Sequence, residues 1–99
     1  MKTVTICGSM RFAEEMKSIA FDLEVLHSLN VLQCVYGDGG HLTPEQRQTL
    51  SRAHYRKIDL SDAIYVIDIG GYIGQSVQQE IDYARAHGKE ILFHSRFGD

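Results

Sequence analysis

The residues best suited to chemistry are a serine and a glutamate four positions apart, directly after a glycine-rich segment. Residues 68–84 read DIGGYIGQSVQQEIDYA and contain Ser76 and Glu80. A glycine loop that leads into a helix presents free backbone N–H groups, which bind phosphates and sugars. A carboxylate in the first turns of that helix would face such a ligand rather than the core. Glu80 could therefore act on a bound substrate.

Both residues also have simple structural interpretations. Ser76 is the expected N-cap of the helix, and Gln79 three residues later would complete a capping box. Glu80 near the helix N-terminus would be favoured by the helix dipole, by about 0.3–1 kcal/mol. Capping by Ser76 is compatible with sugar or phosphate contact, because the same helix end presents free N–H groups. The residues alone leave both interpretations open.

Alternating strands and helices must position these residues. The apolar patterns predict strands over residues 2–8, 31–36, 63–69 and 91–93, and helices over residues 11–29, from 44 to about 58–60, and 76–87. Thr43 and Pro44 form a typical helix start, and Gly88 is well placed to end the last helix. The polar glycine segment at residues 37–43 is expected to form a loop that shapes substrate choice.

This βαβαβαβ pattern predicts an α/β fold with a single domain over residues 1–99. We expect a small, doubly wound, flavodoxin-like or Rossmann-like sheet of four parallel strands in the order 2-1-3-4, with helices on both faces. The switch point of that order lies between the first and third strands. The loops after Gly8 and after Ile69 should therefore line one crevice.

The composition excludes several classes of protein. The formal net charge of −3, with no run of three basic residues, argues against a nucleic-acid binder. No apolar stretch approaches the roughly 20 residues needed to cross a bilayer, and the chain begins directly with a predicted strand. We therefore expect a cytoplasmic protein without membrane contact. Cys7 and Cys34 form no disulfide framework, and the histidines show no metal-ligand spacing, so neither a metal nor a cofactor is expected.

Four ordered motifs resemble the nucleoside 2-deoxyribosyltransferase-like superfamily, which includes the 2'-deoxynucleoside 5'-phosphate N-glycosidases. They are ICGSMR, KIDLSDAIYVIDI, GYIGQSVQQEIDYA and GKEILF, at residues 6–11, 57–69, 71–84 and 88–93. The resemblance implies cleavage of an N-glycosidic bond. The nucleophilic glutamate of the family falls on Glu80, which would attack the anomeric carbon before water or a second base takes the sugar.

The resemblance also implies which residues bind the substrate. The first loop would hold the sugar or its 5'-phosphate, and the glycine loop with the following helix start would supply further contacts. These residues are Gly8, Ser9 and Arg11 in the first group, and Gly71, Tyr72, Gly74 and Ser76 in the second. Tyr72 could stack on a base, although an exposed loop tyrosine without a function is an equal alternative.

The chain differs from the family at two positions. Family enzymes carry an aspartate eight residues before the aspartate that opens the third strand, and His54 occupies that place. His54 could assist proton transfer as a catalytic residue, or it could be a satisfied core histidine beside a snorkelling Lys57. Val77 follows Ser76, where many relatives have threonine.

The expected function is therefore cleavage or transfer of an N-glycosidic bond in a nucleoside or nucleoside 5'-monophosphate. Two alternatives remain: a nucleotide-binding module without turnover, and an NAD-cleaving enzyme similar to Toll/interleukin-receptor-like domains. The short chain leaves the crevice shallow, and the family builds sites at subunit interfaces. We therefore expect a homodimer or higher oligomer.

Overall fold

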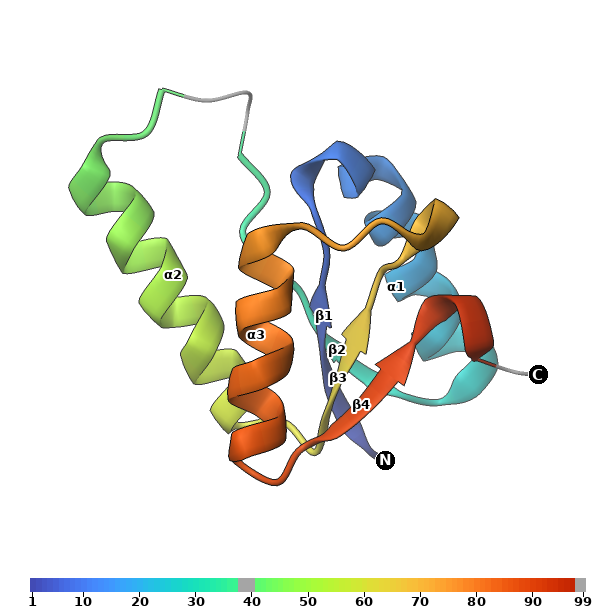
Figure 1. The fold of residues 1–99 in the computed structure, drawn as a ribbon. Coiled ribbons are helices and arrows are strands. Elements are labelled where there is room, and N and C mark those ends of the chain that lie inside the picture. Colours follow the sequence, from blue (N-terminus) through green and yellow to red (C-terminus); the bar gives the residue numbers. More distant parts are fainter. Residues whose placement is uncertain (38–40, 98–99) are drawn as a thin grey trace.

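A computed structural model describes residues 1–37 and 41–97 (Figure 1). Part of the predicted loop over residues 37–43 lies outside the described residues, at 38–40. The strands and main helices are β1 (Thr3–Cys7), α1 (Ala13–His27), β2 (Asn30–Leu32), α2 (Pro44–Asp59), β3 (Ala63–Val66), α3 (Gln75–Ala86) and β4 (Glu90–Phe93). Short 3-10 turns cover Met10–Phe12, Ile69–Gly71 and His94–Arg96. In the described part of the chain, no helix combines the length and apolar composition that a membrane crossing requires.

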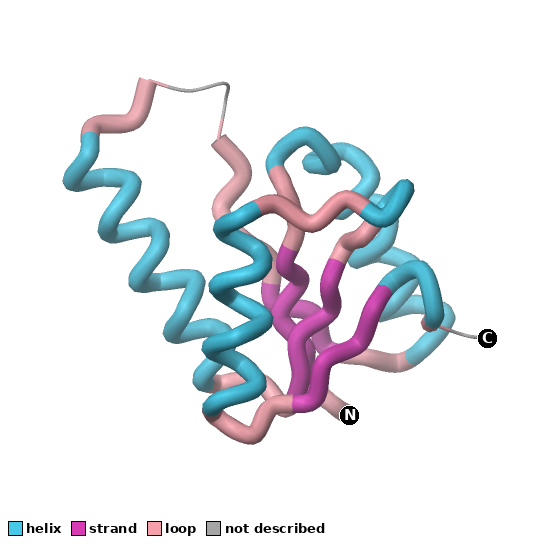
Figure 2. The backbone as a smooth tube through the Cα atoms, viewed as in Figure 1, coloured by secondary structure: helices cyan, strands magenta, loops and turns pink. Residues whose placement is uncertain are grey.

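The four strands form one parallel sheet in the order β2-β1-β3-β4. Helix α1 covers one face, and α2 and α3 cover the other (Figures 1 and 2). This arrangement confirms the predicted α/β class, strand order and placement of helices on both faces.

Strand β1 lies at the centre of the sheet and contributes side chains to the hydrophobic cores on both of its faces. Val4 and Ile6 pack in the core beneath α1, whereas Cys7 packs in the core beneath α2 and α3. This follows from the two-residue period of a strand, which turns successive side chains to opposite faces. Cys7 is fixed further because its backbone oxygen accepts a 2.8 Å hydrogen bond from the N–H of Ile67. The last residue of β1 is thus held rigidly toward α2 and α3.

Two predicted helix ends are confirmed. Thr43 and Gln46 form a complete capping box at the start of α2, with Pro44 as the first helical residue. Gly88 follows α3 with a φ of +72°. The N–H of Lys89 donates to the oxygen of Ala84 at 2.9 Å, which is the hydrogen bond of a Schellman motif.

Other predicted boundaries are wrong. Strand β3 ends at Val66 rather than residue 69, because the chain turns into a 3-10 segment in which Gly70 has a φ of +63°. Helix α3 starts one residue before Ser76, so Gly74 is its N-cap and the predicted cap at Ser76 does not form. Strand β2 is also shorter than predicted and ends at Leu32 instead of residue 36.

Candidate functional site

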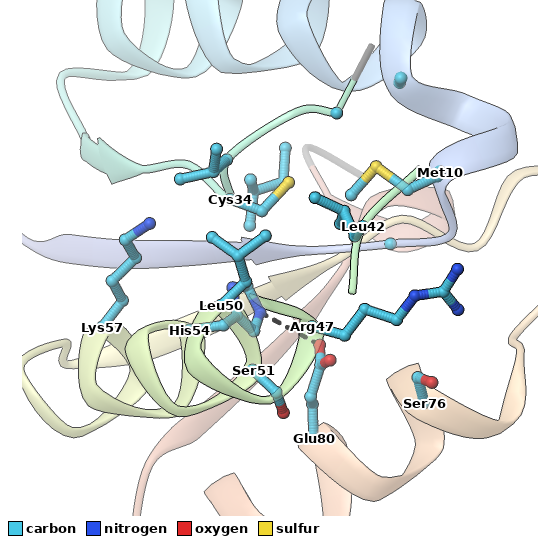
Figure 3. Close-up of a pocket in the computed structure, with 15 residues that line it drawn as sticks. Met10, Cys34, Leu42, Arg47, Leu50, Ser51, His54, Lys57, Ser76 and Glu80 are labelled. Carbon is cyan, nitrogen blue, oxygen red and sulfur yellow. Dashed lines mark hydrogen bonds and ion pairs between the residues drawn. The ribbon is translucent and has the colours of Figure 1, made fainter. Parts of the chain in front are cut away.

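A pocket of about 630 Å³ lies beside the carboxyl end of β1 (Figure 3). Its lining comes from the end of β1 and the turn after it, the segment after β2, helix α2, and the first half of α3. One part of the lining is apolar, with Met10, Val35, Leu42 and Leu50. The polar part consists of Arg47, Ser51, His54, Lys57, Ser76 and Glu80. An apolar wall facing a few polar groups, at this volume, is typical of a small-molecule site.

Three chemically different groups meet beside this pocket, and two of them, His54 and Glu80, line it. Nε2 of His54, on α2, lies 3.2 Å from Oε1 of Glu80, on α3, and 3.5 Å from Sγ of Cys7, on β1. The side chains of His54 and Glu80 are 13% and 15% exposed, and Cys7 is fully buried. We call Cys7, His54 and Glu80 the three-residue cluster. Its members are brought together by three separate elements rather than by spacing along the chain.

The hydrogen bonds of the cluster indicate how the His54 ring is protonated. A carboxylate oxygen accepts hydrogen bonds, so Nε2 of His54 carries the proton and donates to Glu80. The Cys7 thiol has its own acceptor, the backbone oxygen of Thr5 at 3.8 Å. Nδ1 of His54 is buried and has no hydrogen-bond partner among the described residues. The ring is therefore oriented through one nitrogen, which faces Glu80 and the sulfur of Cys7.

Cys7 is a neutral thiol in this arrangement. Burial raises the pKa of the Cys7 thiol well above its ordinary value, and the negative charge of Glu80 raises it further. Burial also raises the pKa of Cys34, which lines the pocket from the segment after β2. A thiol rather than a thiolate is a poor nucleophile. Of the groups in the cluster, the Glu80 carboxylate is thus the one suited to attack a substrate carbon.

The structure places some of the predicted site residues in the pocket. Gly8, His54, Ser76 and Glu80 all contribute to its lining. Lys57 also lines it, and its Nζ donates to the backbone oxygen of Gln33 at 2.9 Å. That bond ties α2 to the segment after β2 and holds the lysine at one side of the pocket.

Other predicted residues lie outside the lining. These are Ser9, Arg11, Gly71, Tyr72 and Gly74. Ser9 instead caps the Met10–Phe12 turn, accepting a 3.3 Å hydrogen bond from the N–H of Arg11. The Arg11 guanidinium lies 3.8 Å from the centre of the Tyr72 ring, so one face of that ring already has a cationic partner. The expected shared crevice is therefore built from the loop after β1, but not from the loop after β3.

Local sequence patterns do not indicate Cys7 of the cluster or several residues that line the pocket. An apolar strand residue such as Cys7 is expected in the core, and the apolar wall comes largely from the segment after β2 and the exposed first half of α2. Only the position of Cys7, at the carboxyl end of the central strand, could have pointed to the site. The expectation of no metal was based on the spacing of histidines and cysteines along the chain. Such spacing cannot reveal a cluster whose members come from three separate elements.

Comparison with known proteins found no matching family model, no matching curated protein and no matching solved structure. The function must therefore be argued from the pocket and its chemistry.

Proposed function

We propose that this chain cleaves or transfers the N-glycosidic bond of a nucleoside or nucleoside 5'-monophosphate, with Glu80 as the nucleophile. The observation that carries the proposal is the position of the Glu80 carboxylate, largely buried in a pocket of about 630 Å³ and oriented by Nε2 of His54 at 3.2 Å. The motif resemblance to nucleoside 2-deoxyribosyltransferase-like proteins supports the same choice of residue.

The reaction would proceed in two steps at Glu80. An oxygen of Glu80 forms a bond to C1' of the sugar while the bond from C1' to the base nitrogen breaks. The transition state has oxocarbenium character, which the adjacent negative charge stabilises. Water then attacks C1', releasing the sugar and the free carboxylate; a second base in place of water gives transfer.

The departing base needs a proton, and His54 is the nearest donor to the nucleophile. Its Nε2–H bonds Glu80 in the resting site and is freed when the carboxylate becomes an ester. For this step the ring first takes up a second proton from solvent; the imidazolium then gives its Nε2 proton to the base and becomes neutral, and the water or incoming base of the second step returns a proton to Nε2. In this proposal the apolar wall of Met10, Leu42 and Leu50 receives the base, and Ser76 lies at the sugar end.

The test is base release from a panel of ribonucleosides, deoxyribonucleosides, their 5'-monophosphates and NAD, followed by chromatography. Glu80→Gln keeps the size of the side chain and removes its negative charge, so release should fall at least about 100-fold. Glu15→Gln, on the exposed surface of α1, is the matched control and should leave release unchanged.

Each outcome of the panel assigns the protein to one class. Release that depends on Glu80 supports the glycosidase and identifies its substrate. Nicotinamide release from NAD alone would favour the NAD-cleaving alternative. Nucleotide binding by folded protein without release of any base would contradict catalysis and favour a binding module.

A further inference from the structure

We propose that the three-residue cluster is a binding site for a single zinc-like divalent metal ion, ligated by Sγ of Cys7, Nε2 of His54 and Oε1 of Glu80. The three ligand atoms all lie within 4.8 Å of one another. This inference goes beyond the proposed glycosidase, because a metal bound to Glu80 would block its use as a nucleophile. Metal loading would therefore inhibit base release.

The spacing of the ligand atoms suits a tetrahedral ion. A Zn–S bond of about 2.3 Å and Zn–N and Zn–O bonds of about 2.0–2.1 Å, at tetrahedral angles, separate sulfur from nitrogen by about 3.5 Å and nitrogen from oxygen by about 3.3 Å. The corresponding distances in the cluster are 3.5 Å and 3.2 Å. Little movement of Cys7 or His54 is therefore needed, and a small rotation of Glu80 would complete the triangle.

The ligand types and their surroundings favour the same class of ion. Thiolate, imidazole and carboxylate are the three protein ligands of Zn²⁺, whereas Mg²⁺ and Ca²⁺ prefer oxygen alone. A thiolate and a carboxylate together balance the charge of a divalent ion, which matters at a site whose sulfur is fully buried. Because His54 and Glu80 line the pocket, the fourth coordination position would face that pocket.

Binding requires one proton to leave. The metal replaces the proton of the neutral Cys7 thiol, forming the sulfur–metal bond and releasing that proton to solvent. The His54 ring stays neutral, its proton moving from Nε2 to Nδ1. Nδ1 has no acceptor among the described residues, and ligating histidines lacking such a partner bind metal about 10–100-fold more weakly. We therefore expect an exchangeable ion rather than a permanent structural one.

The test uses Co²⁺ as a spectroscopic substitute for zinc, added to chelator-treated protein that carries no affinity tag. Wild-type protein should bind one Co²⁺ per chain, with a sulfur-to-cobalt charge-transfer band and strong tetrahedral d–d absorption, and Zn²⁺ should displace it. Cys7→Ala should abolish the charge-transfer band. Cys34→Ala is the matched control, because Cys34 is the other free cysteine and also lines the pocket. It should keep the band.

A second pair of variants covers the chance that Cys7→Ala fails to fold. Glu80→Gln and His54→Gln alter pocket residues rather than a core residue, and each should weaken Co²⁺ binding at least tenfold with an unchanged circular dichroism spectrum. Absence of a charge-transfer band in wild-type protein, or its loss in Cys34→Ala, would overturn the proposed site. Absorption needs no substrate, and the base-release panel is run with chelator added for this comparison, so either proposal can fail while the other stands.

Discussion

Tyr65 joins the sheet to the C-terminal segment through a single buried hydroxyl. Its ring lies in the core beneath α1, and its hydroxyl is 2.7 Å from Nδ1 of His94. Burial raises the pKa of Tyr65 to about 12, with a further contribution from the negative charge of Asp68. The folded protein therefore holds the phenol proton more tightly than the unfolded chain does.

This difference predicts a loss of stability in alkaline solution. Since the pKa of Tyr65 is higher in the folded state than the unfolded value of about 10, its contribution is complete below about pH 10 and disappears as the pH rises toward about 12. Tyr65→Phe should lower stability at pH 8 by about 0.5–1.5 kcal/mol, through loss of the bond to His94. The stability of the variant should also fall less steeply above pH 10.

Urea unfolding of both proteins between pH 8 and 12 would measure the effect. Tyr36, whose pKa burial also raises to about 12, is present in both proteins, so the difference between them isolates Tyr65. Parallel stability curves for the two proteins would show that the phenol of Tyr65 does not titrate as argued.

At the scale of elements, the turn after β1 depends on a close approach that only glycine permits. A Cβ at Gly8 would lie 2.9 Å from Cβ of Ile67 and 2.9 Å from Sδ of Met16. Ile67 directly follows β3. It cannot move easily, because its N–H donates a hydrogen bond to the backbone oxygen of Cys7. The position of Gly8 is thus set by packing rather than by a special backbone conformation.

Gly8→Ala should therefore destabilise the fold by about 1–3 kcal/mol, the usual cost of overpacking a core. Gly37→Ala is the matched control, because a Cβ at Gly37 would meet nothing within 4 Å, and its effect should stay within about 0.5 kcal/mol. Thermal or denaturant unfolding measures both. Equal stability of the two variants would mean that the core beneath α1 relaxes around the added methyl group.

The elements also show what could be predicted from the sequence. The strands and helices followed from apolar periodicity, and the ends at Thr43 and Gly88 followed from capping chemistry, because these signals are local. The strand order and the helix faces followed from the alternation of strands and helices. The start of α3 was missed by one residue because Ser76 has the typical chemistry of an N-cap, whereas Gly74 takes that position and Ser76 is already helical.

Some residues of the candidate site could likewise be predicted from the sequence, and others could not. Glu80 and His54 were both predicted as catalytic residues, Glu80 from the motif resemblance and His54 because it occupies the place of the family aspartate, and the structure brings their side chains into contact. Cys7 was not, since its role depends on which face of β1 turns toward α2 and α3. The pocket wall on α2 was missed as well, because an exposed helix half looks the same in sequence whether or not it borders a cavity.

At the scale of the whole molecule, α1 leaves apolar side chains on the surface. Phe21, Val25 and Leu26 are 66%, 60% and 69% exposed. Phe21 and Val25 are four residues apart, so they share one stripe of the helix. A second copy of the chain could cover this stripe, in keeping with the expected homodimer.

Sedimentation at micromolar concentration tests that expectation. The wild-type chain should sediment as a dimer or higher oligomer, and Phe21→Lys with Val25→Lys should shift it to a monomer because buried lysines oppose an apolar contact. Glu15→Lys, elsewhere on α1, is the control for added positive charge and should leave association intact. A monomeric wild-type chain would contradict the prediction.

The cluster of Cys7, His54 and Glu80 couples binding to folding. Its members are 47 and 26 residues apart along the chain, so they meet only after β1 has paired with β3 and both α2 and α3 have packed. A chain in which β1, α2 or α3 has not packed lacks the site. A ligand or metal that binds only the native protein must raise its melting temperature in proportion to the logarithm of ligand concentration. The melting temperature of the protein therefore reports on occupancy of the pocket. Its measurement across a compound library would find a ligand without any assumption about the reaction.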